Sequence, residues 1–332
     1  MTTAHGWRER MPGLGVAALA AVVAWLVHLA APVVPLLTVA VAAGIVAGQV
    51  PWMRPRLDGP LHPGLAFSAR TLLRAGIVLL GLKLGLGDIA ALGWVTVLTT
   101  VGVVVLTFGG TWWLGRALGL PGREPLLVAS GFAICGASAI GAMGAAVRAR
   151  HEEQAVPVAL VTLCGTLAIA VLPALWHPLG LTAPEFGHWV GAGVHDVGQV
   201  VATAQVAGAS ALAVAVVVKL TRVLLLAPMV AIAAGVERRR ASDAAGPRPA
   251  IVPLFVVGFV VAVLLRTFVP LPEELLAGAD LVQTTLLAMA LFALGASIRV
   301  GALLHTGWRA LVVGVSSWTL VAVLAYGAVL LG

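Results

Sequence analysis

Charged residues are scarce in this chain. Asp, Glu, Lys and Arg make up only 10% of its 332 residues, whereas hydrophobic residues make up 61%. Soluble domains carry about 25% charged residues, so the composition excludes an ordinary soluble fold. The apolar runs are long, and they lack the alternation of apolar and polar residues that is typical of membrane β-strands. The sequence therefore predicts an all-α protein that crosses a membrane many times.

Cysteines and enzyme motifs are also few. The two cysteines, Cys135 and Cys164, lie in apolar segments, which argues against a disulfide framework and a metal site. The HExxH, GxSxG and P-loop motifs are missing, so an enzyme is a less favoured class and we expect no catalytic residue and no cofactor. The net charge of +7 comes without a basic patch interleaved with aromatic residues, so we expect no nucleic-acid partner.

The apolar segments predict the membrane crossings. A helix needs about 20 residues to cross a lipid bilayer, and about eleven segments come near this length. They are residues 14–30, 35–50, 67–84, 93–118, 129–146, 154–175, 186–207, 211–236, 251–269, 281–298 and 308–331. We treat residues 1–332 as one membrane domain with a cytoplasmic tail, residues 1–12, and a charged cytoplasmic linker, residues 237–249.

Arginine-rich loops predict the orientation. They alternate along the chain as expected for a cytoplasmic N-terminus and an external C-terminus. Eleven full crossings leave one conflict, because they place Arg148 and Arg150 outside. The conflict disappears if segments 129–146 and 186–207 are re-entrant, so that each returns to the side from which it starts. The sequence leaves nine to eleven crossings open.

Two stretches of the chain resemble each other. Residues 71–94 and 285–308 align at a constant offset of 214 and share 8 of 24 residues, including Thr71/Thr285 and Trp94/Trp308. In either crossing count the two copies run in opposite directions. This is the pattern of inverted-topology repeats, which place a substrate site near the membrane midplane. Chance similarity between Leu- and Gly-rich stretches is the alternative.

Residues 129–146 are apolar but consist mainly of small residues. Four glycines weaken a helix here, and Ser130 and Ser138 can satisfy freed backbone groups. The sequence Cys135-Gly136-Ala137-Ser138 lies near the middle, where we expect the helix to be broken. Broken helices form substrate sites in many transporters. The alternative is a continuous helix with a small-residue face for close packing.

Cations inside the apolar segments suggest an anion site. Arg74 lies in segment 67–84, and Lys219 and Arg222 share one face near the middle of segment 211–236. A charge at the centre of a membrane helix costs about 2.5–3.5 kcal/mol, so it normally faces protein, water or ligand. No acid occurs between residues 211 and 234, so we expect Asp196 or a bound anion to supply most of the compensating charge. For cations nearer a helix end, the alternative is that they reach the lipid headgroups.

Segment 186–207 contains the sequence His195-Asp196-Val197-Gly198-Gln199. Helical periodicity predicts that His195 and Gln199 share a helical face, as do Asp196, Gln199 and Thr203. A His–Asp pair inside a membrane can carry a proton, because imidazole titrates near neutral pH. A purely structural pair that fixes a broken helix is the alternative.

Four segments resemble the YeiH-like family of bacterial inner-membrane proteins, which is assigned to sulfate export. They read GFAICGASAI, GAGVHDVGQVVATA, VVKLTRVLLLAP and LLAMALFALGASI, and the stretch LLRAGIVLLGLKL fits as well. The matches keep their order over roughly residues 70–305. The resemblance implies a multi-pass carrier of the bacterial inner membrane, with sulfate or an organosulfonate as the exported anion. Asp196 stands where the family often has Glu.

Together these features predict a secondary transporter that exports a small anion by alternating access, coupled to protons or sodium. The alternatives are an uptake carrier or channel for another anion, such as a carboxylate, and a membrane-embedded enzyme. The lipid bilayer is the expected environment, and assembly into a homo-oligomer stays open. We expect His195 and Asp196 to couple ions. The expected substrate-binding residues are Ser130, Cys135, Gly136, Ser138, Arg74, Lys219, Arg222 and Gln199.

Overall fold

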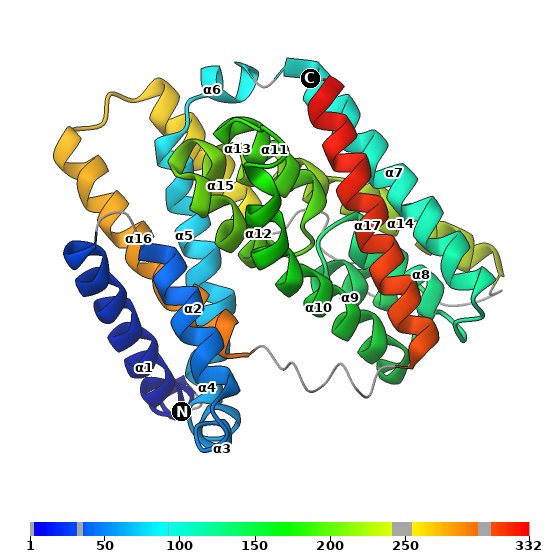
Figure 1. The fold of residues 1–332 in the computed structure, drawn as a ribbon, viewed down its shortest axis with the longest axis horizontal. Helices are drawn as coiled ribbons and strands as arrows, with labels where there is room; N and C mark the ends of the chain where they lie inside the picture. The colour runs from blue at the N-terminus through cyan, green and yellow to red at the C-terminus, as the bar shows by residue number, and fades with distance from the viewer. Residues whose placement is uncertain (1–2, 32–35, 92, 241–253, 298–306, 332) are drawn as a thin grey trace. The chain divides into compact units, whose positions relative to one another are not determined.

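The protein is an all-α polytopic membrane protein, as predicted. The computed structural model describes residues 3–31, 36–91, 93–240, 254–297 and 307–331, and within these ranges it contains helices and no strand (Figure 1). Seven described helical segments are long and apolar enough to cross a membrane. The predicted linker 237–249 lies largely outside the described residues, and the described part of the predicted tail is helical because α1 begins at Thr3.

Contacts divide the chain into two compact units, each built from separated stretches of sequence. Unit 1 comprises residues 1–91 and 254–300, and unit 2 comprises residues 92–253 and 301–332. The helices of unit 1 are α1 (Thr3–Ala30), α2 (Leu36–Gln49), α3 (Arg54–Asp58), α4 (His62–Phe67), α5 (Leu73–Leu80), α6 (Leu86–Ala91), α15 (Leu254–Phe268) and α16 (Glu273–Ala296). A π-helical turn, Ser68–Leu72, joins α4 to α5.

Glycines allow helices of unit 1 to pack with their backbones in contact. A Cβ added to Gly48 on α2 would lie 2.8 Å from the carbonyl oxygen of Ala296 on α16, and one on Gly295 would lie 2.8 Å from the amide of Ile45. Such close approach is the usual way in which membrane helices associate, because lipid offers no hydrophobic drive between them. Lys83, near the end of the same membrane segment as α5, forms an ion pair with Asp280 of α16.

Unit 2 carries the interrupted segments. Its helices are α7 (Gly93–Ala117), α8 (Glu124–Ala133), α9 (Ala137–Ala146), α10 (His151–Trp176), α11 (Ala183–Gly193), α12 (Val197–Ala204), α13 (Ala209–Leu224), α14 (Leu226–Arg240) and α17 (Trp308–Leu331). The predicted span 211–236 is thus two helices that meet at Leu225. Pro228 has no N–H to bond the carbonyl of Leu224, which explains why the helix does not continue unbroken.

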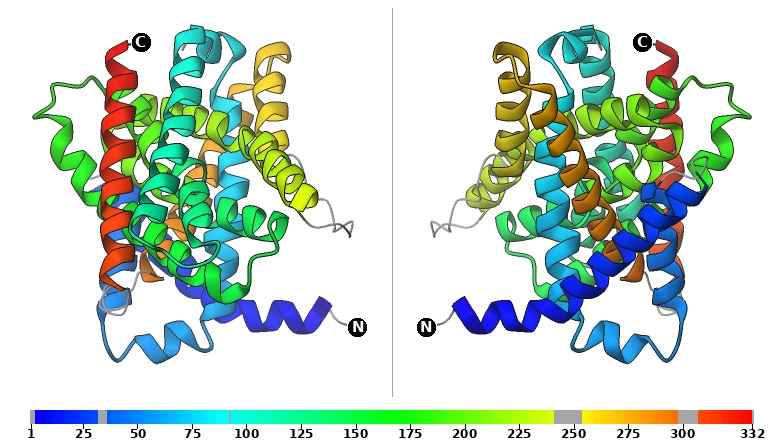
Figure 2. Two further views of the ribbon diagram at one scale, coloured as in Figure 1. Left: turned by 90° about the vertical axis from the view of Figure 1, so that its right-hand side faces the viewer. Right: turned by 90° about the vertical axis from the view of Figure 1, so that its left-hand side faces the viewer.

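The repeat extends further than the sequence indicates. At the offset of 214, α7 and α17 correspond almost end to end, since Gly93 matches position 307 and Ala117 matches Leu331. Within unit 2 these helices run antiparallel, and within unit 1 the helix α5 runs antiparallel to the matching part of α16 (Figures 1 and 2). Within each unit, the described helix of one copy therefore runs opposite to its counterpart, which is the direction that inverted repeats require. Residues 298–306 of the second copy lie outside the described ranges.

The first interrupted segment is re-entrant. Its two helices, α8 and α9, have 10 residues each and so are each about 15 Å long. Arranged end to end, they would separate Arg123 from Glu153 by roughly 30 Å. Instead, the amide of Arg123 donates a hydrogen bond of 3.2 Å to Oε1 of Glu153. The segment thus forms a helical hairpin, which we call hairpin 1 (residues 124–147).

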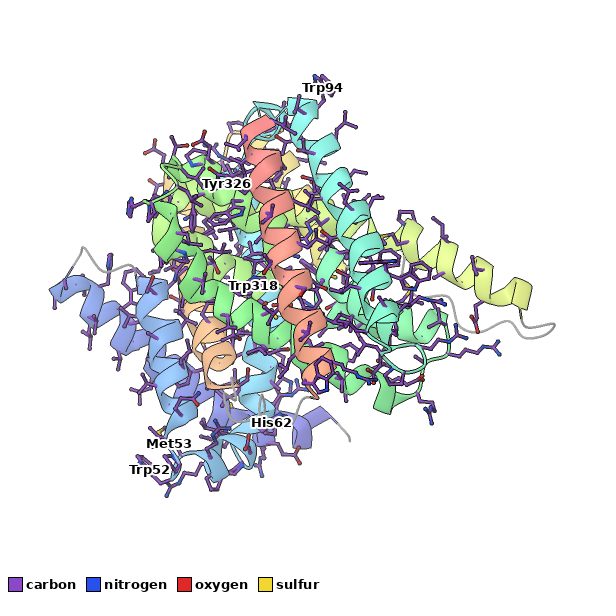
Figure 3. All side chains as sticks on the ribbon, turned by 45° about the vertical axis from the view of Figure 1, so that its right-hand side comes forward. Trp52, Met53, His62, Trp94, Trp318 and Tyr326 are labelled. Carbon is purple, nitrogen blue, oxygen red and sulfur yellow. The ribbon has the colours of Figure 1, made fainter. Side chains whose placement is uncertain are left out.

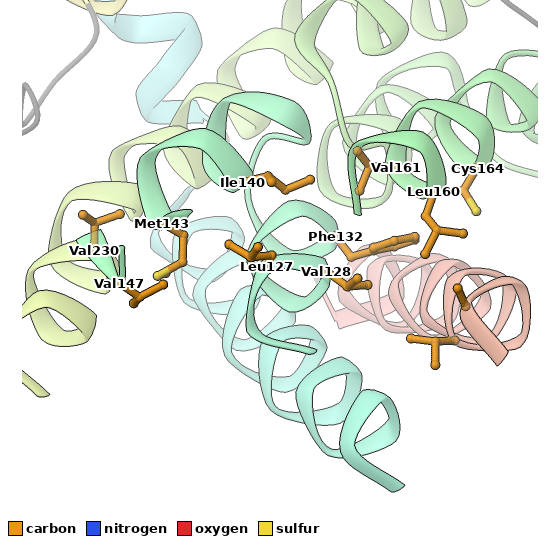
Figure 4. Close-up of a cluster of buried hydrophobic side chains, with 12 residues drawn as sticks. Leu127, Val128, Phe132, Ile140, Met143, Val147, Leu160, Val161, Cys164 and Val230 are labelled. Atoms are coloured by element: carbon orange, nitrogen blue, oxygen red, sulfur yellow. The ribbon is translucent and has the colours of Figure 1, made fainter. Parts of the chain in front are cut away.

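A buried apolar cluster holds the two arms of hairpin 1 together (Figure 4). Leu127 and Phe132 of α8 pack in this cluster with Ile140 and Met143 of α9. Leu160 and Cys164 of α10 complete it from outside the hairpin, and all six side chains are almost fully buried. The apolar side chains of the two short helices are therefore buried against protein and not against lipid.

The second interrupted segment is also re-entrant. A Cβ on Gly187 of α11 would lie 2.8 Å from Cα of Ala211, and one on Gly191 would lie 3.0 Å from Cα of Ala215, both on α13. The helices α11 and α13 therefore pack side by side in the same direction, and α13 begins beside the start of α11. The chain between them, through α12, must run back to that side. We call this segment hairpin 2 (residues 183–207).

Aromatic residues attach hairpin 2 to α17. The indole Nε1 of Trp189 donates a hydrogen bond of 2.8 Å to the carbonyl of Ala322, and its ring lies 5.9 Å from that of Tyr326. Figure 3 shows Tyr326 and Trp318 on α17. With both interrupted segments re-entrant, the crossing segments are the seven long ones and the shorter helices α2 and α15, which is the lower end of the predicted range.

Candidate functional site

The tips of the two hairpins meet inside unit 2. Tip 1 is Ile134–Gly136, between α8 and α9, and tip 2 is Val194–Asp196, between α11 and α12. A Cβ added to Gly136 would lie 3.7 Å from the amide nitrogen of Asp196. The hairpins approach from opposite ends of α10, because hairpin 1 precedes α10 and hairpin 2 follows it. The Gln199 side chain bonds the carbonyl of Thr162, so the tips lie level with the middle of α10.

Arg222 of α13 connects the two tips. Its guanidinium is 0% exposed and donates six hydrogen bonds to five backbone carbonyls. Nε and Nη2 bond Ala133 at 3.1 and 2.7 Å, and Nη2 also bonds Phe132 at 2.9 Å. Nη1 bonds Ala192 at 2.6 Å, Val194 at 3.0 Å and Gly191 at 3.4 Å. The planar fork thus spans the ends of α8 and α11.

Lys219 lies one turn before Arg222 and makes a similar connection. Its ammonium is also 0% exposed, and Nζ donates to the carbonyls of Ile134 at 2.5 Å and Val194 at 2.9 Å. These two carbonyls belong to tip 1 and tip 2.

These contacts explain how two buried cations are tolerated. The last carbonyls of any helix have no partner within that helix, and they carry the negative end of the helix dipole. Lys219 and Arg222 donate hydrogen bonds to these last carbonyls of both α8 and α11, and their positive charges face the negative ends of both helix dipoles. The sequence predicts that Asp196 or a bound anion supplies most of the compensating charge, and that stays a prediction; what the structure adds is a set of backbone carbonyls that accept hydrogen bonds from both cations. The sequence does not reveal these carbonyl partners, because a backbone carbonyl has no signature in the sequence.

The two tips differ at the start of their second helices. The N-terminus of α12 is capped by Asp196, whose Oδ2 accepts a hydrogen bond of 2.8 Å from the amide of Gly198. Gln199 completes a capping box by accepting from the amide of Asp196 at 3.2 Å. The N-terminus of α9 follows Gly136 and has no side-chain cap. Its first residues, Ala137 and Ser138, are exposed, so hairpin 1 presents an uncapped helix start next to a carboxylate.

His195 is fully buried in tip 2, with its ring 4.5 Å from that of Phe132 in an edge-to-face arrangement. Neither ring nitrogen has a hydrogen-bond partner among the described residues. No hydrogen bond therefore joins His195 to Asp196. The predicted common face with Gln199 is wrong, because His195 precedes the N-cap of α12 and helical periodicity does not apply to it.

The other predicted site residues fall into two groups. Cys135 and Gly136 form tip 1 and are buried, and Ser130 lies in α8, where its hydroxyl bonds the carbonyl of Leu127 at 2.8 Å. Arg74 belongs to unit 1, where it is exposed and its guanidinium lies 5.6 Å from the ring of Phe255. Their roles in binding stay predictions.

Gly165 of α10 has a role that the sequence does not indicate. A Cβ at this position would lie 2.7 Å from Nε2 of Gln199, so a larger residue would displace the amide from its present position at the cap of α12. The single sequence signal is a glycine within an otherwise apolar helix.

A polytopic membrane protein with two opposed re-entrant hairpins is the class that this fold and site define. The chain belongs to the family of UPF0324 membrane proteins, the YeiH-like group, since the family model described as Conserved hypothetical protein 698 matches residues 12–314.

Relatives in the family are similar over most of their length. A UPF0324 membrane protein of Corynebacterium glutamicum is 39% identical over 322 residues, covering 96% of this chain and 92% of the relative. One of Pseudomonas aeruginosa is 36% identical, covering 92% and 89%. One of Staphylococcus aureus is 32% identical, covering 71% of each chain. No solved structure matches.

Proposed function

We propose that the protein is a secondary carrier that exports a small anion across the bacterial inner membrane by alternating access. The observation that carries the proposal is the meeting of two opposed hairpin tips at the level of the middle of α10. Interrupted helices within inverted repeats are the arrangement in which carriers bind substrate near the midplane. Irregular backbone at membrane depth is tolerated where protein buries it or where it lines a wet cavity.

The charge of the tips favours an anion. Lys219 and Arg222 bring two positive charges and Asp196 brings one negative charge, so the assembly has a formal surplus of one positive charge. The exposed start of α9 adds backbone N–H groups and the positive end of a helix dipole, which attract anions. We assign the direct contacts to these N–H groups and to the hydroxyl of Ser138. Arg222 then acts by holding the tips in place, because its donors already face carbonyls.

The resemblance to the YeiH-like family supports export of sulfate or an organosulfonate. The orientation follows from the arginines, because loops rich in Arg stay in the cytoplasm. On this basis the N-terminus is cytoplasmic. Asp196, which borders the uncapped start of α9, is the candidate for coupling transport to an ion gradient.

Flux into proteoliposomes tests the proposal. We expect saturable uptake of labelled sulfate, of a small sulfonate or of both, stimulated by unlabelled anion on the opposite side. Ser138→Ala should raise the half-saturating concentration, whereas Gly141→Ala, on the same helix with no atom near its Cβ position, should leave it unchanged. Flux that does not saturate would indicate a channel, exchange of carboxylates alone would indicate another substrate, and product formation would indicate an enzyme.

A further inference from the structure

Lys219 occupies a position with the chemistry of an alkali-cation site. Its Nζ lies between the carbonyl oxygens of Ile134 and Val194, which come from different hairpins, and the group is fully buried. In carriers with broken helices, unwound carbonyls and the C-terminal ends of half-helices coordinate Na⁺. The two carbonyls that contact Nζ here are of the same kind, since Ile134 directly follows α8 and Val194 directly follows α11.

A cation at this position stabilises the contact between the two tips. The C-termini of α8 and α11 both point toward it, so two negative dipole ends face each other across the tips. Without a positive charge between them, carbonyls of both tips would be buried without a partner, at a cost for each. The planar guanidinium of Arg222 satisfies carbonyls of Phe132, Ala133 and Ala192, and the compact ammonium of Lys219 satisfies the carbonyl of Ile134. Both cations bond the carbonyl of Val194.

We propose that the ammonium of Lys219 is a tethered substitute for a free monovalent cation, and that it makes the tip assembly independent of sodium. The cation site itself does not depend on the transport activity. Its consequence for coupling does rest on the proposed function: the carrier should be driven by protons or by anion exchange, and not by sodium. Removing the side chain should leave the carbonyls of Ile134 and Val194 free to bind a cation together with water.

Thermal unfolding of the purified full-length protein tests this inference. The wild-type melting temperature should be the same in sodium chloride and in choline chloride at equal ionic strength. Lys219→Ala should melt at a lower temperature in choline chloride. Sodium, ammonium or methylammonium chloride should raise that temperature by about 3 °C or more, as a ligand that binds only the folded state does.

Two variants provide controls. Lys219→Met removes the charge but keeps the volume, so it should be destabilised without responding to small cations. Lys83→Ala removes the exposed lysine that pairs with Asp280, and it should respond to salts as the wild type does.

Three results would overturn the inference. One is sodium-specific stabilisation of the wild type, the second is a Lys219→Ala protein that no small cation stabilises or rescues, and the third is an equal response of Lys219→Met. The readout needs no transported substrate. A cation-dependent Lys219→Ala protein that transports no anion would therefore refute the proposed function and leave the cation site standing.

Discussion

At the scale of single residues, the tips depend on carbonyls that their own helices cannot satisfy. Arg222 serves the ends of α8 and α11 simultaneously, so its loss would leave carbonyls of both hairpins buried without a donor. Leaving a buried carbonyl without its donor typically costs about 1–3 kcal/mol for each group. The guanidinium suits this position because its donors lie in one plane and point in fixed directions.

We expect Arg222→Gln to lower the free energy of unfolding by about 2–4 kcal/mol, because a glutamine can satisfy only some of these carbonyls. Arg222→Lys should recover only part of this loss, because an ammonium has three donors where the guanidinium has five. Intrinsic tryptophan fluorescence during thermal and denaturant unfolding measures the difference. Arg116→Gln is the control, since Arg116 is exposed and should change stability by less than about 0.5 kcal/mol. Wild-type stability in Arg222→Gln would show that the carbonyl contacts contribute little.

Asp196 combines a charge with a capping role, and one substitution separates the two. Asparagine caps helices about as well as aspartate, so Asp196→Asn should keep α12 and the melting temperature nearly unchanged. It removes the only carboxylate of the two tips. We therefore expect gradient-driven accumulation of the anion to be lost while anion exchange persists, measured in proteoliposomes with and without an imposed gradient. If the variant still accumulates the anion when a proton gradient is imposed, Asp196 has a structural role only.

At the scale of elements, the hairpins are defined by short breaks between half-helices. Gly136 adopts φ +64° and ψ −134°, a conformation open to glycine and strained for other residues. Five residues later, Gly141 lies inside α9, and no atom lies within 4 Å of the position that a Cβ would take there. The same substitution at these two glycines should therefore have opposite effects.

We expect Gly136→Ala to destabilise the protein by roughly 1–3 kcal/mol, because its backbone would have to hold an alanine in a conformation that essentially only glycine adopts. Gly141→Ala should be neutral or stabilise by up to about 1 kcal/mol, because alanine is the better helix former. Both free energies come from denaturant unfolding of the purified proteins. Equal effects at the two positions would mean that tip 1 does not hold Gly136 in this conformation.

The sequence predicts these elements only in part, and the reasons are physical. Glycine-rich composition locates the break near Gly136, because weak helix formers act locally. Whether the chain then continues or turns back depends on contacts such as Arg123 with Glu153, which are 30 residues apart. Likewise, the cost of burying a charge in a membrane predicts that Lys219 and Arg222 have partners within the protein or a ligand. The sequence does not show that these partners are backbone carbonyls. Arg74 carries the same charge, yet it belongs to the other unit.

At the scale of the whole molecule, the arginines of unit 2 indicate its orientation. Arg123 forms an ion pair of 2.6 Å with Glu237 at the end of α14, and Nη1 of Arg309 lies 3.6 Å from the Cβ position of Gly119, just after α7. The start of α10 lies at the same end of unit 2, because Glu153 of α10 accepts a hydrogen bond from the amide of Arg123. At the opposite end, the described residues of unit 2 include no Arg or Lys. Because positively charged loops stay inside, we assign the arginine-rich end to the cytoplasm.

Labelling of single cysteines by a membrane-impermeant maleimide tests both the orientation and the re-entrant fold. The background is a variant without Cys135 and Cys164, both of which are buried. Ala117→Cys, at the last residue of α7, and Arg150→Cys, just before α10, are exposed positions on either side of hairpin 1. Since hairpin 1 returns to its own side, both should be labelled in inside-out vesicles and protected in intact cells.

Pro178→Cys, after α10, should show the reverse pattern, because α10 has 26 residues and its length of about 39 Å exceeds the roughly 30 Å of the hydrocarbon core. It is therefore the control for a true crossing. Labelling of Ala117→Cys and Arg150→Cys from opposite sides would contradict the hairpin and require residues 124–147 to cross the bilayer. Labelling of both from outside would keep the hairpin but invert the orientation, and the arginines would then lie on the side that the distribution of charge disfavours.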